Sequence, residues 1–147
     1  MRRITLFAAT LALGAMAVTL SGCHTNPPTQ QEVKAFDYGP LPENYEQIVR
    51  DYLRYKLTDP TAAIVEFKAG PRKMVQRDTV IRNQQVGWAV CAMVNDKNTR
   101  GAYAGFRPAV YFIRNGKVVA HNGGWDDGPV GAKYARDQCK ELGFEVP

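Results

Sequence analysis

The stretch Val86-Gly87-Trp88-Ala89-Val90-Cys91-Ala92-Met93-Val94 decides the fold, because it is apolar almost throughout. A continuous apolar run of this length, without the alternation of a half-exposed strand, is typical of a strand that is covered on both faces. We therefore expect residues 86–94 to form a central strand of a β-sheet. The segments on either side of them should supply its neighbours.

Two further strands are expected after the central one, over residues 108–114 and 117–121. They flank Asn115-Gly116, and an Asn-Gly pair between two strands is the strongest short signal of a β-hairpin. The reason is conformational, since the two-residue turn needs positive φ at both positions. The pair therefore predicts that these two strands run antiparallel.

Two strands are also expected before the central one. Residues 64–68 are predicted to form the first, which Gly70-Pro71 interrupts. Residues 74–82 alternate weakly between apolar and polar side chains, as an exposed edge strand does. The predicted sheet thus has four or five strands.

A helix is expected between Asn44 and about Thr58. Asn44 and Gln47 fit a capping box at its start, and Pro60 disfavours helical geometry at the residue before it. Apolar residues recur at helical spacing and form one stripe: Tyr45, Ile48, Val49, Tyr52, Leu53 and Leu57.

A second helix is expected over residues 130–142. Ala135, Cys139 and Leu142 mark its inner face, and Gly143 stands where a left-handed stop is expected. The elements together predict an α+β domain with an N-terminal helix, a four- to five-stranded antiparallel sheet and a C-terminal helix. Both helices are expected on one face of the sheet.

The segment before this domain has the parts of a secretory signal peptide. Arg2 and Arg3 supply positive charge, residues 4–20 are uncharged and largely apolar, and the segment closes with Leu20-Ser21-Gly22-Cys23. That tetrapeptide resembles a bacterial lipobox. The resemblance implies cleavage before Cys23, with a diacylglycerol on its sulfur and a third acyl chain on its new amine. The alternative is a transmembrane helix that stays in place.

The expected organisation is therefore a signal peptide over residues 1–22, a lipidated tether over 23–40 and one globular domain over 41–147. The tether is polar and contains Pro27-Pro28, a composition that cannot build a core. In enteric lipoproteins an Asp after the anchor cysteine favours retention in the inner membrane. This chain has His24 there, so the lipobox resemblance implies the outer membrane, facing the periplasm. Loss of Arg2 and Arg3 lowers the formal charge of +5 by two and leaves a mildly basic domain.

Cys91 and Cys139 remain once the anchor cysteine is set aside. An even number of cysteines in an oxidising compartment favours a disulfide, which would be worth about 4 kcal/mol in the chain-entropy description. Cys91 lies on the central strand and Cys139 on the inner stripe of the last helix, so the two can meet. The alternative is a pair of buried free thiols.

Four short motifs follow one another between residues 45 and 119. They are Asp59-Pro60-Thr61-Ala62-Ala63, Gly87-Trp88-Ala89-Val90-Cys91, Val94-Asn95-Asp96-Lys97-Asn98 and Gly101-Ala102-Tyr103-Ala104-Gly105-Phe106. This combination resembles a group of small proteobacterial secreted proteins and lipoproteins, from which the chain departs at Asp96, Ala102 and Ala104. The resemblance supports the fold and implies no activity.

Residues 95–107 form the loop with the most informative composition. Glycines permit close backbone approach, and cations beside aromatic rings suit an anionic or sugar-bearing ligand. The candidate ligand residues are Lys97, Asn98, Arg100, Tyr103, Phe106 and Arg107. The alternative is a connection whose Asn side chains satisfy the turning backbone and whose aromatic rings close the edge of the core.

His121, with Asp126 and Asp127 shortly after it, is the only place in the sequence that resembles an acid–base group. No nucleophile, phosphate-loop or zinc-ligand motif is present, so we predict no catalytic residue, no metal and no cofactor. Gly131-Ala132-Lys133-Tyr134 is similar to a segment of periplasmic lysozyme-inhibitor lipoproteins, which are β-barrels.

The sequence therefore predicts a non-catalytic, lipid-anchored envelope protein that binds a partner or supports an envelope assembly. The membrane is one expected partner, through the anchor, and an envelope protein or cell-wall polymer is another. Nucleic acid is not expected, because no basic run is present. The alternatives are a small hydrolase acting on peptidoglycan or lipid through His121, and an inhibitor of a lysozyme-like enzyme.

Overall fold

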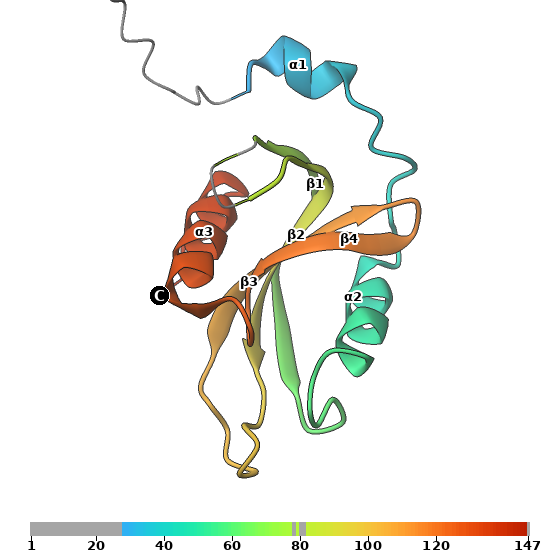
Figure 1. The fold of residues 1–147 in the computed structure, drawn as a ribbon. Helices are drawn as coiled ribbons and strands as arrows, with labels where there is room; N and C mark the ends of the chain where they lie inside the picture. The colour runs from blue at the N-terminus through green and yellow to red at the C-terminus, as the bar shows by residue number, and fades with distance from the viewer. Residues whose placement is uncertain (1–27, 78, 80–81, 147) are drawn as a thin grey trace, which may run out of the picture.

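The computed structural model describes residues 28–77, 79 and 82–146. Cys23 and the expected signal peptide lie outside these residues. Four strands and three helices follow one another as α1, α2, β1, β2, β3, β4 and α3 (Figure 1). Within the described ranges, no helix is long and apolar enough to cross a membrane.

The sheet is a four-stranded antiparallel meander in the order β1, β2, β3, β4. Its strands are β1 (Ile64–Gln76), β2 (Gln85–Asn95), β3 (Arg107–Arg114) and β4 (Lys117–Gly123). β2 and β3 are buried along almost their whole length and pair from Val94 with Arg107 to Trp88 with Ile113. The prediction of a central strand at residues 86–94 is confirmed.

The β3–β4 hairpin turns at Asn115-Gly116, as expected. Asn115 has a φ of 52° and Gly116 a φ of 72°, which are the positive values that a two-residue turn requires. Gly123 closes the far end of the hairpin with a φ of 74°. A Cβ on Gly123 would clash with the carbonyl oxygen of Pro108 and with the Cβ of Ala135, so no other residue fits there.

β1 differs from the prediction of two separate strands over residues 64–68 and 74–82. It is one strand that continues through Gly70-Pro71, with register shifts between Phe67 and Ala69 and between Ala69 and Arg72. A proline lacks an amide hydrogen, and an edge strand can accommodate this defect as a bulge because one side of it has no neighbour. β1 ends at Gln76, so the expected extension to Arg82 is wrong.

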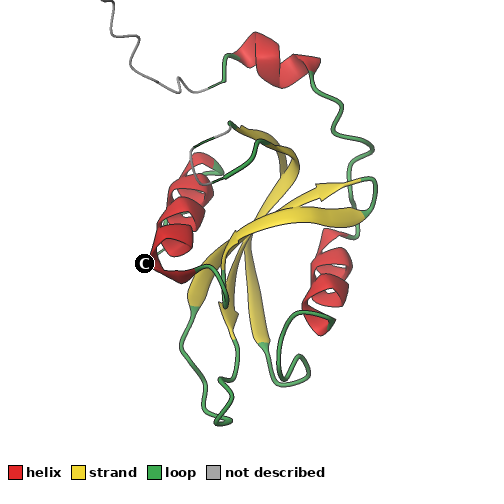
Figure 2. Ribbon diagram, viewed as in Figure 1, coloured by secondary structure: helices red, strands yellow, loops and turns green. Residues whose placement is uncertain are grey.

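The helices pack on opposite faces of the sheet, and the expectation that they share one face is wrong (Figures 1 and 2). α2 (Tyr45–Arg54) places Val49 and Leu53 against one face. α3 (Gly128–Glu141) places Ala135 and Cys139 against the other. The reason lies in β2 and β3, whose side chains are apolar on both faces, because each apolar face needs its own cover.

The alternation along β2 and β3 separates the two core layers. The residues that face α2 are Val90, Ala92, Val94, Ala109, Tyr111 and Ile113. The residues that face α3 are Ala89, Cys91, Val110 and Phe112.

Cys91 and Cys139 form the disulfide that the sequence predicts. Their Cα atoms lie 5.4 Å apart, and the bond joins positions 48 residues apart in the chain. Both cysteines are fully buried. The bond therefore fastens α3 to the central strand from inside the core.

The segment expected as a tether is partly ordered on the domain. α1 (Gln30–Ala35) begins with a capping box in which the Thr29 side chain accepts a hydrogen bond from the Glu32 amide. Tyr38 is 3% exposed and packs with Val75 and Val86 in a third apolar cluster, and Trp88 Nε1 donates to the carbonyl of Gly39 at 3.2 Å. The described end of this segment therefore contacts the sheet through Tyr38 and Gly39.

Candidate functional site

The candidate ligand loop, residues 95–107, is held mainly by its own backbone and asparagines. Asn98 Oδ1 accepts hydrogen bonds from the amides of Arg100 and Ala102, at 2.9 and 3.2 Å. Asn95 Oδ1 accepts one from the amide of Gly105 at 3.0 Å. These asparagine oxygens satisfy turning backbone, which is the structural role that the sequence left open as the alternative.

Two residues of this loop reach the turn that follows α2. Lys97 Nζ lies 3.4 Å from Asp59 Oδ2 and 5.6 Å from the centre of the Tyr103 ring. The Tyr103 hydroxyl donates to the carbonyl of Ala62 at 3.0 Å. A hydrogen bond from the Thr61 hydroxyl, one from the Ala62 amide and the nearby Lys97 lower the pKa of Asp59. Lys97 and Tyr103 therefore join two connections at one end of the sheet.

The remaining residues of the loop point elsewhere. Arg107 Nη1 donates to the carbonyl of Trp125 at 3.3 Å, on the segment between β4 and α3. Arg100 is exposed at the tip, and Phe106 is 44% exposed. The six candidate residues thus do not converge on one cavity in the described part of the chain.

His121 is held at both ring nitrogens. Nε2 lies 3.0 Å from Asp126 Oδ1, and Nδ1 lies 3.0 Å from the hydroxyl of Tyr52 on α2. A carboxylate can only accept, so in the neutral ring Nε2 donates to Asp126 and Nδ1 accepts the Tyr52 proton. The sequence predicted the pairing of His121 with Asp126 as one option, and it missed Tyr52.

Aromatic rings enclose this imidazole. The Trp125 ring stacks on His121 with centroids 4.8 Å apart and an interplanar angle of 15°, and Tyr111 stacks at 6.3 Å. Burial and the Asp126 charge raise the pKa of Tyr52, and burial raises that of Tyr111. The Tyr111 hydroxyl is buried and has no hydrogen-bond partner among the described residues. A phenol with a raised pKa is a poor proton donor, so this cluster is better suited to packing than to catalysis.

Asp127 belongs to a different network on the α3 face. Its carboxylate pairs with Arg82 Nη2 and accepts the amide of Gly123 at 2.8 Å. Arg82 Nη1 also donates to Asn122 Oδ1 at 2.9 Å, and Asn122 is 2% exposed. The network fixes the start of α3 to the end of β4, and Asp127 therefore does not assist His121.

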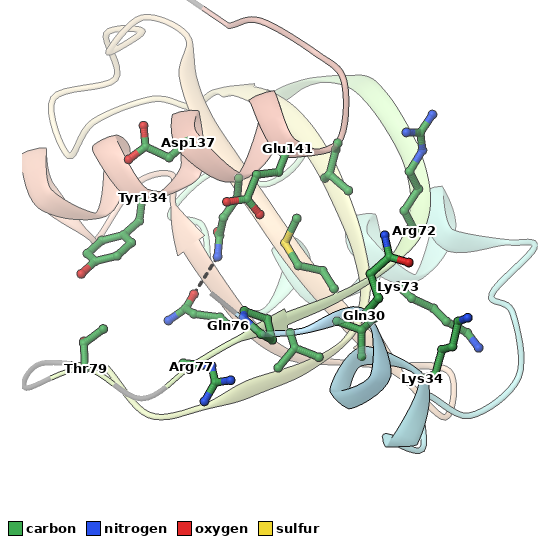
Figure 3. A pocket seen from close by; sticks show the side chains of 16 residues that line it. Gln30, Lys34, Arg72, Lys73, Gln76, Arg77, Thr79, Tyr134, Asp137 and Glu141 are labelled. Carbon is green, nitrogen blue, oxygen red and sulfur yellow. Dashed lines mark hydrogen bonds between the residues drawn. The ribbon is translucent and has the colours of Figure 1, made fainter. Parts of the chain in front are cut away.

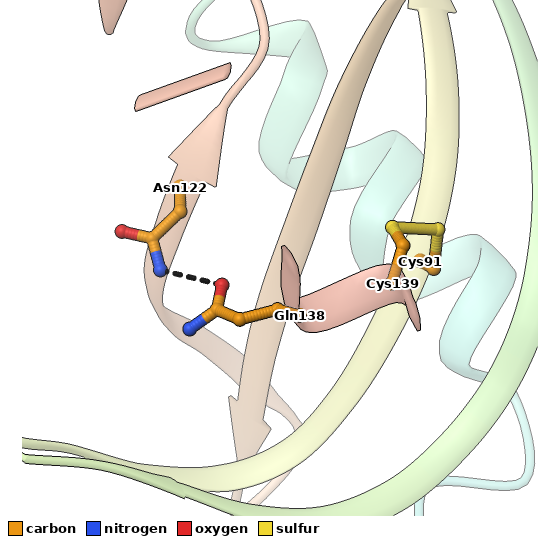
Figure 4. The surroundings of a disulfide bond; sticks show 4 residues. All are labelled: Cys91, Asn122, Gln138 and Cys139. Atoms are coloured by element: carbon orange, nitrogen blue, oxygen red, sulfur yellow. Dashed lines mark hydrogen bonds between the residues drawn. A yellow bond between two sulfur atoms is a disulfide. The ribbon is translucent and has the colours of Figure 1, made fainter. Parts of the chain in front are cut away.

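The same network continues from Asn122 to α3 (Figure 4). Asn122 Nδ2 donates to Gln138 Oε1 at 2.8 Å and to Gln76 Oε1 at 2.6 Å, and Gln138 Nε2 donates to Gln76 Oε1 at 2.7 Å. The three amides join β4, α3 and β1 beside the disulfide. Gln76 is thus the member of this polar cluster that lies on β1, and it also lines the cavity described next.

A groove of about 790 Å³ runs along this edge of β1, between α3 and α1. In Figure 3 the side chains of Tyr134, Asp137 and Glu141 lie on one side of β1, and those of Gln30 and Lys34 lie on the other. We call this cavity the β1 groove. It is lined by Pro28, Gln30, Val33, Lys34, residues 72–77, Thr79, Tyr134, Asp137, Gln138, Glu141 and Leu142.

The floor of the β1 groove is apolar and its rim is charged. Met74 and Val75 are buried on opposite faces of the strand, the first against α3 and the second in the cluster beside α1. Arg72 and Lys73 are exposed beside them. Burial and the neighbouring Asp137 raise the pKa of Glu141 on the α3 rim.

Two residues that line the groove each carry a buried nitrogen without an acceptor. Gln76 Nε2 and Arg77 Nε have no hydrogen-bond partner among the described residues. Arg77 still pairs through Nη2 with Glu32 of α1 at 2.7 Å. A hydrogen bond left unmade at a buried donor costs about 1–3 kcal/mol, so a ligand oxygen that reached either nitrogen after a side-chain movement would gain a hydrogen bond.

The sequence predicts no site at the β1 groove, although each wall of the groove has a recognisable pattern. Residues 72–77 alternate between the two faces, and residues 134, 137, 138 and 141 share one side of α3 at helical spacing. Thr29 and Glu32 have the spacing of a capping box. Those signals describe single elements, and the groove exists only where three of them meet.

The described residues hold no group of three or more His, Cys, Asp or Glu side chains that could bind a metal ion. Comparison with protein-family models, with curated proteins and with solved structures finds no match to this chain.

Proposed function

We propose that this chain is a lipid-anchored protein of the bacterial cell envelope whose domain binds a partner in the β1 groove. The anchor is Cys23, and the proposed location is the outer membrane, facing the periplasm. The observation that carries the binding role is the groove itself, which combines an apolar floor, a charged rim and two buried donors without acceptors. Concave sites with a few placed polar groups are the usual form of a ligand site.

The disulfide supports the proposed compartment. Disulfides persist in the periplasm and are rare in the bacterial cytosol, where thiols are kept reduced. The bond between Cys91 and Cys139 lies in the core, and α3, which it holds, is also one wall of the groove. A protein that folds around this bond benefits from oxidising surroundings.

Photo-crosslinking in living cells tests the binding role. A photoreactive residue at Arg72 or at Lys73, both exposed on the groove, should yield a specific crosslinked species. The matched control places the same residue at Arg100, which is exposed outside the groove. Equal products from all three positions, or none from the groove, would contradict the proposal.

The anchor is tested separately, because it does not depend on the groove. Cys23→Ser should give an unlipidated protein that leaves the membrane fraction, and globomycin should block processing of the unaltered chain. If neither treatment changed processing or fractionation, the lipoprotein proposal would fail while the groove proposal stood.

A hydrolase acting on peptidoglycan or lipid is the second candidate, and the contact between His121 and Asp126 favours it. Both ring nitrogens of His121 are already bonded within the chain, so catalysis would require one of these bonds to open. Purified protein should then digest cell-wall material, and His121→Ala should abolish this activity. Absence of turnover by the unaltered protein would remove this candidate.

A further inference from the structure

We infer that the β1 groove binds an extended segment of a partner protein, rich in acidic side chains, which adds to β1 as a fifth strand of the sheet. The inference rests on the proposed function, because it names the partner of the same groove. Three features of the groove lead to it: the free edge of the strand, the donors without acceptors, and the balance of charge on the rim.

The edge of β1 is available for pairing. Among the described residues β1 pairs with β2 alone, and no other backbone hydrogen bond involves residues 64–76. Every second residue of an edge strand turns its amide and carbonyl outward. Between Arg72 and Gln76 this outward edge lies in the groove between α1 and α3, so an added strand would be held from both sides.

The unpartnered donors favour a ligand that supplies oxygen atoms. Gln76 Nε2 and Arg77 Nε are both N–H groups, and neither has an acceptor among the described residues. Backbone carbonyls and carboxylates of a peptide supply such acceptors. A purely apolar segment that filled the groove with side chains alone would leave both donors without an acceptor.

The rim selects an acidic segment. Lys34, Arg72 and Lys73 have no ion-pair partner in the described part of the chain, and Lys73 Nζ lies 5.1 Å from the centre of the Tyr38 ring and 5.5 Å from that of Trp88. On the opposite rim Asp137 already pairs with Lys133 at 2.7 Å, which leaves Glu141 as the uncompensated acid. The rim thus has a surplus of positive charge.

A second copy of the chain is a poorer occupant of the same edge. β1 carries Lys68, Arg72 and Lys73, and Arg77 directly follows its last residue, so pairing two such strands would bring these cations together. Like charges on facing strands are destabilising, and charged edge residues commonly prevent such self-association.

The test uses the full chain, purified as cells process it, and a fluorescent peptide of about eight residues that alternates Glu and Val. One matched peptide has Lys in place of Glu, and another has Pro in place of the central Val residues. Binding is measured by fluorescence anisotropy, and protection of the β1 amides by hydrogen exchange. Vesicles of phosphatidylglycerol form a separate arm, because lipid headgroups also present anionic oxygens.

The Glu–Val peptide should bind and protect outward amides between residues 72 and 76. The proline peptide, which cannot donate to the ladder, should bind about tenfold more weakly or worse. Arg72→Glu should weaken binding about tenfold, as expected for loss of a charge-assisted contact, while Arg100→Glu should leave it unchanged.

Equal binding of the proline peptide, or binding without protection of β1, would overturn strand addition and leave a groove that attracts anions. Protection by the vesicles and not by the peptide would overturn it in favour of a headgroup site. No binding by any peptide would also overturn it. The proposed function, partner binding in the β1 groove, is tested independently by the photo-crosslinking in cells.

Discussion

The hydroxyl of Tyr52 and Nδ1 of His121 lie 3.0 Å apart, although 69 residues separate them in the chain. This contact joins α2 to β4, the edge strand farthest from β1. Trp125 covers the imidazole, whose side chain is only 16% exposed. This hydrogen bond therefore holds α2 against β4, on the face of the sheet that α2 covers.

Tyr52→Phe should lower the free energy of unfolding by about 1 kcal/mol, since it removes one largely buried hydrogen bond and keeps the ring. Chemical denaturation measures this loss. Tyr55→Phe is the matched control, because Tyr55 is 89% exposed, and it should change nothing. Equal stability of the Tyr52 variant and the unaltered protein would show that the contact contributes nothing.

Reduction of the disulfide, or Cys139→Ala, should lower stability by roughly 2–5 kcal/mol. Hydrogen exchange should then show α3 opening before the sheet, because β2 and β3 remain packed against α2 on the other face. Thiol labelling of denatured, natively secreted protein without reductant checks the bond itself. Quantitative labelling of both Cys91 and Cys139 would show that the bond does not form.

Glu141→Gln should raise stability at neutral pH. Burial and Asp137 raise the pKa of Glu141 above its ordinary value of 4.5 in the folded protein, so the ionised form is less favourable there than in the unfolded chain. This destabilisation is complete above the folded pKa and disappears below roughly pH 4, where both states are protonated. Urea titrations at the two pH values measure it. Glu145→Gln, an exposed change nearby, serves as control, and a loss of stability in Glu141→Gln at pH 7 would contradict the expectation.

Gly123→Ala should destabilise the fold by more than about 2 kcal/mol. A residue with a Cβ loses about 1–2 kcal/mol in the left-handed region, and the clash with the Pro108 carbonyl adds to this. Gly116→Ala is the matched comparison, since Gly116 has a similar φ of 72° and open space around it. Thermal unfolding should therefore show a much lower stability for Gly123→Ala than for Gly116→Ala. Equal losses of stability would mean that the close approach of Gly123 to Pro108 and Ala135 is unimportant.

Local signals predicted the central strand, the hairpin and the disulfide, because each depends on a few neighbouring residues or on one pairing. Asn115-Gly116 fixes its turn by backbone conformation alone. Cys91 and Cys139 were the only cysteines left to pair after Cys23 was assigned to the anchor. The sequence could not show that β1 continues through Pro71, since the bulge depends on β1 being an edge strand.

The placement of the helices required more than periodicity. The stripe on α2 and the stripe on α3 each predict an inner face, but neither tells which side of the sheet receives it. The uninterrupted apolar character of residues 86–94 indicates a strand that is covered on both faces, and this favours one helix on each face over two helices on the same face. The β1 groove could not be predicted at all, because Glu141, Arg72 and Lys34 meet there only through the tertiary fold.

Pro28 lines the β1 groove and stands five positions after Cys23. Five residues span at most about 18 Å, so the proposed lipid anchor would keep the end of the groove at Pro28 within that distance of the bilayer surface. A partner would then be met in a thin layer rather than in the whole periplasmic volume. Confinement of this kind raises the effective concentration of two membrane-bound molecules for each other, so a weak contact in the groove would be sufficient for a partner anchored in the same membrane.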